Sequence, residues 1–187
     1  ARIPQRAKIL LFWSFRSPYS QLALKQVIDV AARTGARIDL RAVLPMVMRG
    51  LQVPLQKRLY IARDTAREAR DVGVPYGYFV DPVGTPTERA FVALWVARRT
   101  GRELLLMQAW ADKVWSRGVD AGCDDGLRAV CEAAGLDWSD VRDALVSTRV
   151  DEEWRAWAEA NRVRLYGLGL WGVPSFAVVS DDAEERV

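Results

Sequence analysis

The chain has 187 residues, half of them apolar and 27% charged, and its formal net charge is only +3. This length and composition are typical of one large globular domain with a buried core and argue against disorder. Because basic and acidic residues are interleaved, we expect solvated helix faces and no nucleic-acid partner. The sequence has no histidine, which excludes catalytic triads or dyads built on imidazole and metal sites with histidine ligands.

An apolar run over residues 8–14 predicts a buried strand that is covered on both faces. Ser17 and Pro18 follow after a short turn, and serine is a favourable N-cap while proline suits the first position of a helix. Apolar residues at helical spacing continue towards Gly35, where we expect the helix to end. Residues 37–44 predict a second strand, which completes a right-handed βαβ unit with parallel strands.

From about residue 54 to residue 166 the pattern is almost entirely helical. Glycine and proline residues divide this stretch into short segments. The predicted helices are 55–72, 86–99, 102–117, 124–134, 138–147 and 151–164. Asp124, Asp137 and Asp151 stand where helix caps are expected. We find no internal repeat and no low-complexity linker.

A glycine-rich turn and a proline lead out of the helical stretch over residues 167–174, and a third strand is predicted from residue 175 to residue 179. Ser180 and the two aspartates that follow it predict a hairpin turn, and Arg186 is expected to begin a fourth strand. Because the last strand of a sheet must be paired or covered, we expect the protein to continue beyond residue 187.

The two cysteines, Cys123 and Cys131, lie eight positions apart in or beside a predicted helix. They do not form a C-x-x-C motif, so we expect two buried or partly buried free thiols, which suit a reducing compartment. The N-terminal apolar run is too short for a signal peptide, and no segment has the roughly 18 apolar residues that a membrane span needs. The sequence therefore predicts a cytoplasmic protein with no membrane partner.

A βαβ unit, a helical block and a proline-led strand, in this order, form the layout of a thioredoxin fold with a helical insertion. Ser17-Pro18-Tyr19-Ser20 occupies the turn where redox members carry Cys-Pro-x-Cys, and Val173-Pro174 precedes the third strand. With these motifs the chain resembles the DsbA-like branch, and within it the 2-hydroxychromene-2-carboxylate isomerases and the kappa-class glutathione transferases. Further stretches that support the resemblance are Phe12-Trp13-Ser14-Phe15, Arg41-Ala42-Val43-Leu44, Lys57-Arg58-Leu59-Tyr60, Val114-Trp115-Ser116-Arg117 and Gly169-Leu170-Trp171-Gly172.

The resemblance implies the fold class and the division of the chain. The class is α/β, a thioredoxin-like fold with a large all-helical insertion of the DsbA-like type. Residues 1–45 and 167–187 would form the thioredoxin-like domain, and residues 46–166 the insertion. Because relatives often dimerise, the resemblance also allows a homodimer.

Ser17 is the candidate catalytic residue, because it would stand at the N-terminus of the first helix. That end carries partial positive charge and free N–H groups, which stabilise an anion such as a bound thiolate. The Ser17 hydroxyl can donate a hydrogen bond to sulfur but cannot form a disulfide. The alternative is that Ser17 only caps the helix.

The resemblance implies glutathione as the cofactor and assigns further residues to it. Pro174 would follow a cis peptide bond, so that the backbone of Val173 could clamp the glutathione peptide; the alternative is an ordinary trans proline. Lys57 stands where the family has a lysine that meets the glutathione carboxylate, and a solvated helix residue is an equal alternative. Tyr19 and Trp171 are candidates for an apolar pocket that holds an aromatic substrate, and packing in the core is their alternative.

The sequence departs from the family pattern in two places. The family has an asparagine after the second strand that touches the ligand, and here only Gln52 stands nearby. The family also has an Asp-Arg segment after the last strand, which binds the γ-glutamyl end of glutathione, and the given sequence ends before it.

The function implied by the resemblance is a glutathione-dependent cis–trans isomerase for 2-hydroxychromene-2-carboxylate or a related aromatic 2-oxo acid, in aromatic catabolism. In the implied mechanism the glutathione thiolate adds to a conjugated double bond, the adduct rotates, and the thiolate leaves. A kappa-like glutathione transferase and a non-catalytic thioredoxin-fold binding module remain alternatives. A disulfide oxidoreductase is rejected, because neither position 17 nor position 20 holds a cysteine.

Overall fold

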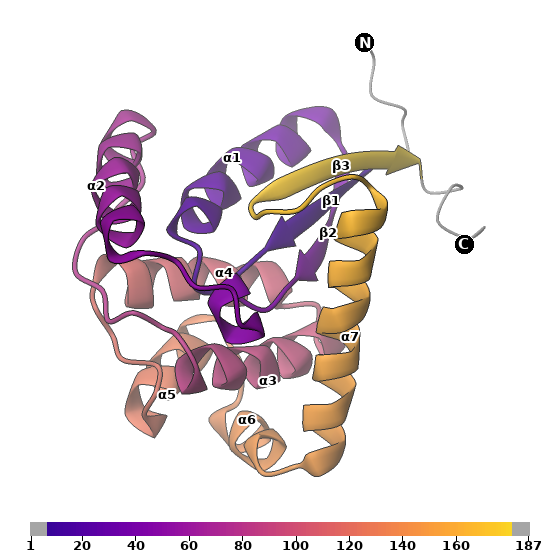
Figure 1. Ribbon diagram of the computed structural model, residues 1–187. Helices are drawn as coiled ribbons and strands as arrows, with labels where there is room; N and C mark the ends of the chain where they lie inside the picture. Colours follow the sequence, from indigo (N-terminus) through magenta and orange to yellow (C-terminus); the bar gives the residue numbers. More distant parts are fainter. Residues whose placement is uncertain (1–6, 181–187) are drawn as a thin grey trace.

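The computed structural model describes residues 7–180 of the chain (Figure 1). In this part a small mixed sheet is covered by helices on both faces, and a block of helices lies next to it. The hairpin turn expected at Asp181 and Asp182 and the fourth strand expected from Arg186 lie outside the described residues.

The described sheet has three strands: β1 (Ala7–Trp13), β2 (Arg37–Ala42) and β3 (Ser175–Ser180). Their order is β2-β1-β3, with β1 parallel to β2 and antiparallel to β3. The central strand β1 is buried along nearly its whole length, as a strand covered on both faces requires. The three strands predicted from the sequence are therefore confirmed.

Helices α1 (Pro18–Thr34) and α7 (Thr148–Gly167) cover opposite faces of the sheet (Figure 1). Successive side chains of a strand point to opposite faces. The odd-numbered side chains of β1 accordingly share one buried cluster with Leu24 of α1. The even-numbered Leu10 and Phe12 form a second cluster with Leu165 of α7, and the turn that follows α7 packs on this second cluster.

The block between β2 and α7 confirms the predicted helices within three residues. Its elements are the 3-10 helix η1 (Met46–Arg49), α2 (Leu55–Asp71), α3 (Thr85–Arg99), α4 (Glu103–Trp110), the π-helical η2 (Ala111–Ser116), α5 (Asp124–Ala133) and α6 (Trp138–Leu145). The helix predicted over 102–117 is divided, because its last turn adopts π-helical hydrogen bonding. One buried cluster extends from β1 through α3, α4 and α5, so the proposed division into domain and insertion stays a prediction.

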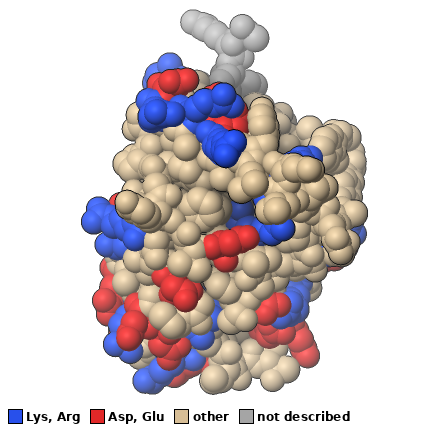
Figure 2. Space-filling view, turned by 60° about the vertical axis from the view of Figure 1, so that its left-hand side comes forward, with Lys and Arg blue, Asp and Glu red and all other residues tan. Residues whose placement is uncertain are grey.

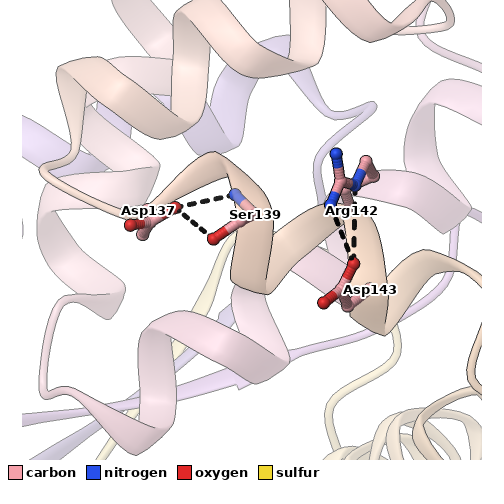
Figure 3. Close-up of polar contacts among 4 residues, drawn as sticks. All are labelled: Asp137, Ser139, Arg142 and Asp143. Carbon is pink, nitrogen blue, oxygen red and sulfur yellow. Dashed lines mark hydrogen bonds and ion pairs between the residues drawn. The ribbon is translucent and has the colours of Figure 1, made fainter.

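Helix α6 shows how local polar contacts set a helix start (Figure 3). A carboxylate oxygen of Asp137 accepts hydrogen bonds from the backbone N–H and the hydroxyl of Ser139, both at 2.7 Å. These bonds hold the pKa of the Asp137 carboxyl below its usual range. On the same helix, Arg142 pairs with the neighbouring Asp143. Asp137 is thus confirmed as a cap.

The other two expected caps are wrong. The N-cap of α5 is Cys123, and Asp124 is the first residue inside that helix. Helix α7 starts three residues earlier than predicted, because Ser147 has an extended backbone and its hydroxyl accepts from the N–H of Val150 at 3.4 Å. Asp151 therefore lies in the first turn of α7, where a carboxylate is favourable next to the helix dipole.

The two cysteines are free thiols, and only one of them is buried. Cys131 packs in the main core, and burial raises the pKa of its thiol to about 12. The expectation of a buried or partly buried thiol is wrong for Cys123, which is exposed because it caps α5 from the preceding loop.

Candidate functional site

The candidate site lies at the edge of the sheet where β1 and β2 end and β3 begins. The strand register pairs Trp13 with Ala42 on one side, and Phe12 with Ser175 on the other. Because β3 runs antiparallel, the turn before it meets the turn after β1 at this edge. Two segments that are far apart in the sequence are thereby placed side by side.

Ser17 caps α1 and also contacts the turn before β3. Its backbone is extended, and its hydroxyl oxygen accepts a hydrogen bond from the N–H of Ser20 at 3.2 Å. The same hydroxyl donates to the backbone oxygen of Val173 at 3.4 Å. Ser17 as a whole is half-buried.

The peptide bond between Val173 and Pro174 is cis, as predicted. The carbonyl of Val173 is engaged by the Ser17 hydroxyl. Its N–H has no hydrogen-bond partner among residues 7–180. An extended peptide can therefore pair with this N–H as it would with the edge of a sheet.

The N-terminus of α1 provides a positive field at this point. The first turn contains no acidic side chain, and proline at its start leaves fewer N–H groups that need a partner. The aligned peptide dipoles of a 17-residue helix place about half a positive charge at its N-terminus. The arrangement is suited to holding a thiolate or a carboxylate next to Ser17.

Tyr19 makes a contact that the sequence did not predict. Its hydroxyl donates to a carboxylate oxygen of Asp64 at 2.6 Å, and Asp64 also pairs with Arg67. Burial and then the Asp64 carboxylate raise the pKa of Tyr19 to about 12, and the bond from Tyr19 lowers the pKa of Asp64. The half-buried tyrosine is not a core residue; it ties α1 to α2.

The other predicted ligand residues are exposed side chains. Trp171 is 70% exposed and forms no part of the core. Lys57 and Gln52 are exposed on α2 and on the loop before it. On the face shown in Figure 2, charged side chains of both signs gather at the top and over the lower part, and a smaller group of both signs lies in the middle. The functions expected of Lys57, Gln52 and Trp171 stay predictions.

Two buried polar residues behind Ser17 were missed. The amide nitrogen of Gln21 donates to the backbone oxygens of Ser17 and Ser14 at 3.2 and 3.5 Å, and its amide oxygen has no partner among the described residues. The hydroxyl of Ser20 accepts a hydrogen bond from the N–H of Ser14, and the backbone carbonyl of Ser20 accepts one from the indole of Trp13. A polar residue four positions after Ser17, on the buried face of a helix, was the available signal.

An ion pair holds the residue that precedes Ser17. The guanidinium of Arg16 donates to both carboxylate oxygens of Asp81, at 2.7 and 2.6 Å. Bidentate pairs of this kind fix geometry as well as charge. The two residues are 65 positions apart, and no local sequence signal indicates the contact.

Two further features were sought among the described residues. Over residues 7–180, no group of three or more His, Cys, Asp or Glu side chains could hold a metal ion. In the same range, no helix has the length and apolar character needed to cross a membrane.

Comparison with known proteins was made on the sequence and on the fold. A family model described as a DSBA-like thioredoxin domain matches residues 8–186. The chain belongs to this family. None of the curated proteins compared with this DsbA-like chain matches it.

Solved structures of similar fold include a 2-hydroxychromene-2-carboxylate isomerase, with a TM-score of 0.74, 18% identity, and coverage of 91% of this chain and 84% of that one. The cytosolic disulfide reductase DsbM from Pseudomonas aeruginosa matches with a TM-score of 0.72, 18% identity and coverage of 93% and 85%. A second structure of DsbM, with GSH, matches with a TM-score of 0.68, 17% identity and coverage of 95% and 91%. The predicted thioredoxin-like fold with a helical insertion is confirmed by the family model and by these structures of similar fold.

Proposed function

We propose that this DsbA-like protein is a glutathione-dependent cis–trans isomerase that acts on 2-hydroxychromene-2-carboxylate or a related aromatic 2-oxo acid. The proposal rests on one observation: the Ser17 hydroxyl lies at the N-terminus of α1 and contacts Val173 beside the cis bond to Pro174. An anion-stabilising helix end next to a free backbone N–H suits a peptide that carries a thiol. Among the similar structures, DsbM with GSH supports glutathione as the ligand, and the isomerase supports the class of reaction.

Two parts of this chain suit glutathione. The N–H of Val173, which has no partner among residues 7–180, can donate a hydrogen bond to the glutathione backbone. Ser17 and the first turn of α1 can hold the sulfur. Lys57, exposed on α2, is proposed for a carboxylate of the ligand. Glutathione, when bound, supplies a thiol whose reversible addition to a conjugated double bond permits rotation about that bond.

Ser17 has one task in this chemistry, which is to keep the sulfur ionised and in place. Its hydroxyl, which now donates to Val173, can donate to a thiolate instead, and the helix dipole lowers a thiol pKa at this position. The absence of histidine is compatible with this reaction, because a thiolate that adds and then leaves needs no imidazole base. The Tyr19 hydroxyl donates its proton to a hydrogen bond with Asp64, so it takes no part in proton transfer in the proposed reaction.

Two other functions compete for the same site. A kappa-like glutathione transferase would keep the thiolate position and release a conjugate; turnover of a small aryl halide, without turnover of the isomerase substrate, would favour it. A non-catalytic binding module is favoured by the exposed positions of Lys57 and Trp171. Disulfide exchange remains rejected, because serine stands at positions 17 and 20.

Calorimetric titration with glutathione tests the proposal, with ultraviolet absorbance of the thiolate and turnover of 2-hydroxychromene-2-carboxylate as further readouts. Ser17→Ala should weaken binding about tenfold, as expected for losing a hydrogen bond to a charged group, and should abolish the thiolate signal. Ser147→Ala is a matched control, because Ser147 caps α7 with nearly the same backbone angles (φ −88°, ψ 110°) as Ser17 (φ −87°, ψ 110°).

The control variant should bind glutathione like the unmodified protein. If the unmodified protein does not bind glutathione, both glutathione-dependent functions are wrong and the binding module remains. If glutathione binds without turnover of the isomerase substrate, the aryl-halide assay decides between the transferase and the binding module.

A further inference from the structure

The backbone carbonyl of Phe15 is held by two indole groups. Trp110 Nε1 and Trp115 Nε1 each donate a hydrogen bond to it at 3.1 Å, and all three residues are buried. A carbonyl oxygen has two lone pairs, so both are used here. Phe15 lies in the turn between β1 and α1, two residues before Ser17.

The π-helical turn η2 explains how two tryptophans reach one oxygen. Trp110 and Trp115 are five residues apart, and in an α-helix such side chains point about 140° away from each other. In a π-helix the backbone hydrogen bond links residues five apart, which brings their side chains to the same side. Trp110 directly precedes η2 and Trp115 lies within it, so the local change of helix type permits the two N–H groups to converge.

The same turn is held from a second direction. Arg16, between Phe15 and Ser17, forms its bidentate pair with Asp81. The loop that carries Asp81 packs on Trp115, because the ring centroids of Phe79 and Trp115 lie 4.9 Å apart. The N–H of Gly77 in this loop also donates to the backbone oxygen of Trp115, at 3.1 Å.

We propose that Trp110 and Trp115 are positioning residues, which act through the Phe15 carbonyl to hold Ser17 and the start of α1 against the Val173 turn. This inference rests on the proposed thiolate site at Ser17. Loss of either indole N–H leaves a buried lone pair unmatched, so the peptide between Phe15 and Arg16 can rotate. The N-terminus of α1 is then less well aligned with an anion at position 17.

The test introduces a reporter thiol at the site. In Ser17→Cys, the pKa of the introduced thiol reports how strongly this position stabilises an anion. The pKa is obtained from the pH dependence of alkylation by iodoacetamide. Alkylation is measured by mass spectrometry on the peptide that contains position 17. In this background, Trp115 or Trp110 is replaced by benzothienylalanine, which keeps the shape of the ring and lacks the N–H. The same replacement at Trp95, whose indole donates to Glu153 at 3.0 Å, is the matched control.

The pKa of the introduced thiol should rise by about half a pH unit when Trp110 or Trp115 loses its N–H, because the less well aligned helix end stabilises the thiolate less. The control at Trp95 should leave it unchanged. An unchanged pKa in both test variants, or an equal rise in the control, would overturn the proposal, even if melting temperatures fall. Glutathione does not enter this experiment, so failure of glutathione binding would refute the proposed function and not this inference.

Discussion

Replacing Gln21 with leucine removes a buried amide that connects the start of α1 to the turn before it. Gln21 is 3% exposed, and its nitrogen donates to Ser17 O at 3.2 Å and to Ser14 O at 3.5 Å. Its oxygen has no partner among the described residues. Leucine has a similar volume and can form neither bond, so the change separates packing from hydrogen bonding.

The two effects on stability oppose each other. Losing the shorter hydrogen bond costs about 1 kcal/mol, and the bond at 3.5 Å lies at the limit of useful geometry and adds little. Removing an unpaired buried oxygen returns about 1–3 kcal/mol. The free energy of unfolding should therefore stay the same or rise by up to about 2 kcal/mol. Glutathione affinity should fall several-fold, because the backbone of Ser17 loses an anchor.

Urea unfolding, followed by tryptophan fluorescence, measures the first quantity and calorimetry the second. Gln26→Leu, at an exposed position of the same helix, is the control and should change stability by less than about 0.5 kcal/mol. Gln21→Glu would place a carboxylate against two carbonyl oxygens, so it should lower both stability and glutathione affinity. If Gln21→Leu destabilises the protein by more than about 2 kcal/mol, its amide oxygen has a partner and the reasoning is refuted.

Three further measurements address the thiols, alkaline pH and a second buried amide. An aromatic disulfide reagent should titrate Cys123 in the folded protein and Cys131 only after unfolding, because burial raises the pKa of Cys131 to about 12; two fast thiols would contradict this. Burial raises the pKa of Tyr76 from 10.0 to about 12, so the folded state holds this proton more tightly than the unfolded state does. The contribution of Tyr76 to the stability of the fold is therefore lost as the pH rises from 10 towards 12. Tyr76→Phe should flatten that loss in a series of melting temperatures, and an identical pH profile would rule the explanation out. Asn161→Ala removes the 2.9 Å hydrogen bond from α7 to the carbonyl of Ala42 and should lower the free energy of unfolding, measured in urea, by about 1–3 kcal/mol. Val163→Ala, at an exposed position of the same helix, is the control, and an equal loss in both variants would contradict the prediction.

The features predicted best from the sequence are those with a local physical cause. The apolar run of β1, the serine and proline at the start of α1, and the glycine at its end each determine backbone conformation within a few residues. The cis bond before Pro174 was expected from the resemblance to a known family, and it is confirmed. The contact of Val173 with Ser17 depends on the strand order β2-β1-β3, which places the turn before β3 next to the start of α1.

The features that were missed depend on how distant elements pack. The partner of Tyr19 is Asp64, 45 residues away, and this contact requires the orientation of α2, which no periodicity in the sequence specifies. Packing in the core, the alternative for Trp171, is wrong because its turn leaves it exposed, whereas its place in a substrate pocket stays a prediction. The π-helical turn escaped prediction, because Trp110 and Trp115 satisfy an α-helical pattern equally well until the position of the Phe15 carbonyl is known.

Ser17 and Ser147 begin their helices with almost identical backbone angles, and each hydroxyl caps its own first turn. What distinguishes them is a neighbour 156 residues away in the sequence, since only Ser17 meets the turn that ends in Pro174. A search confined to short sequence windows would therefore score both serines alike. Under the proposed function, substitutions in the turn over residues 168–173 should change ligand choice while the serine motif stays constant.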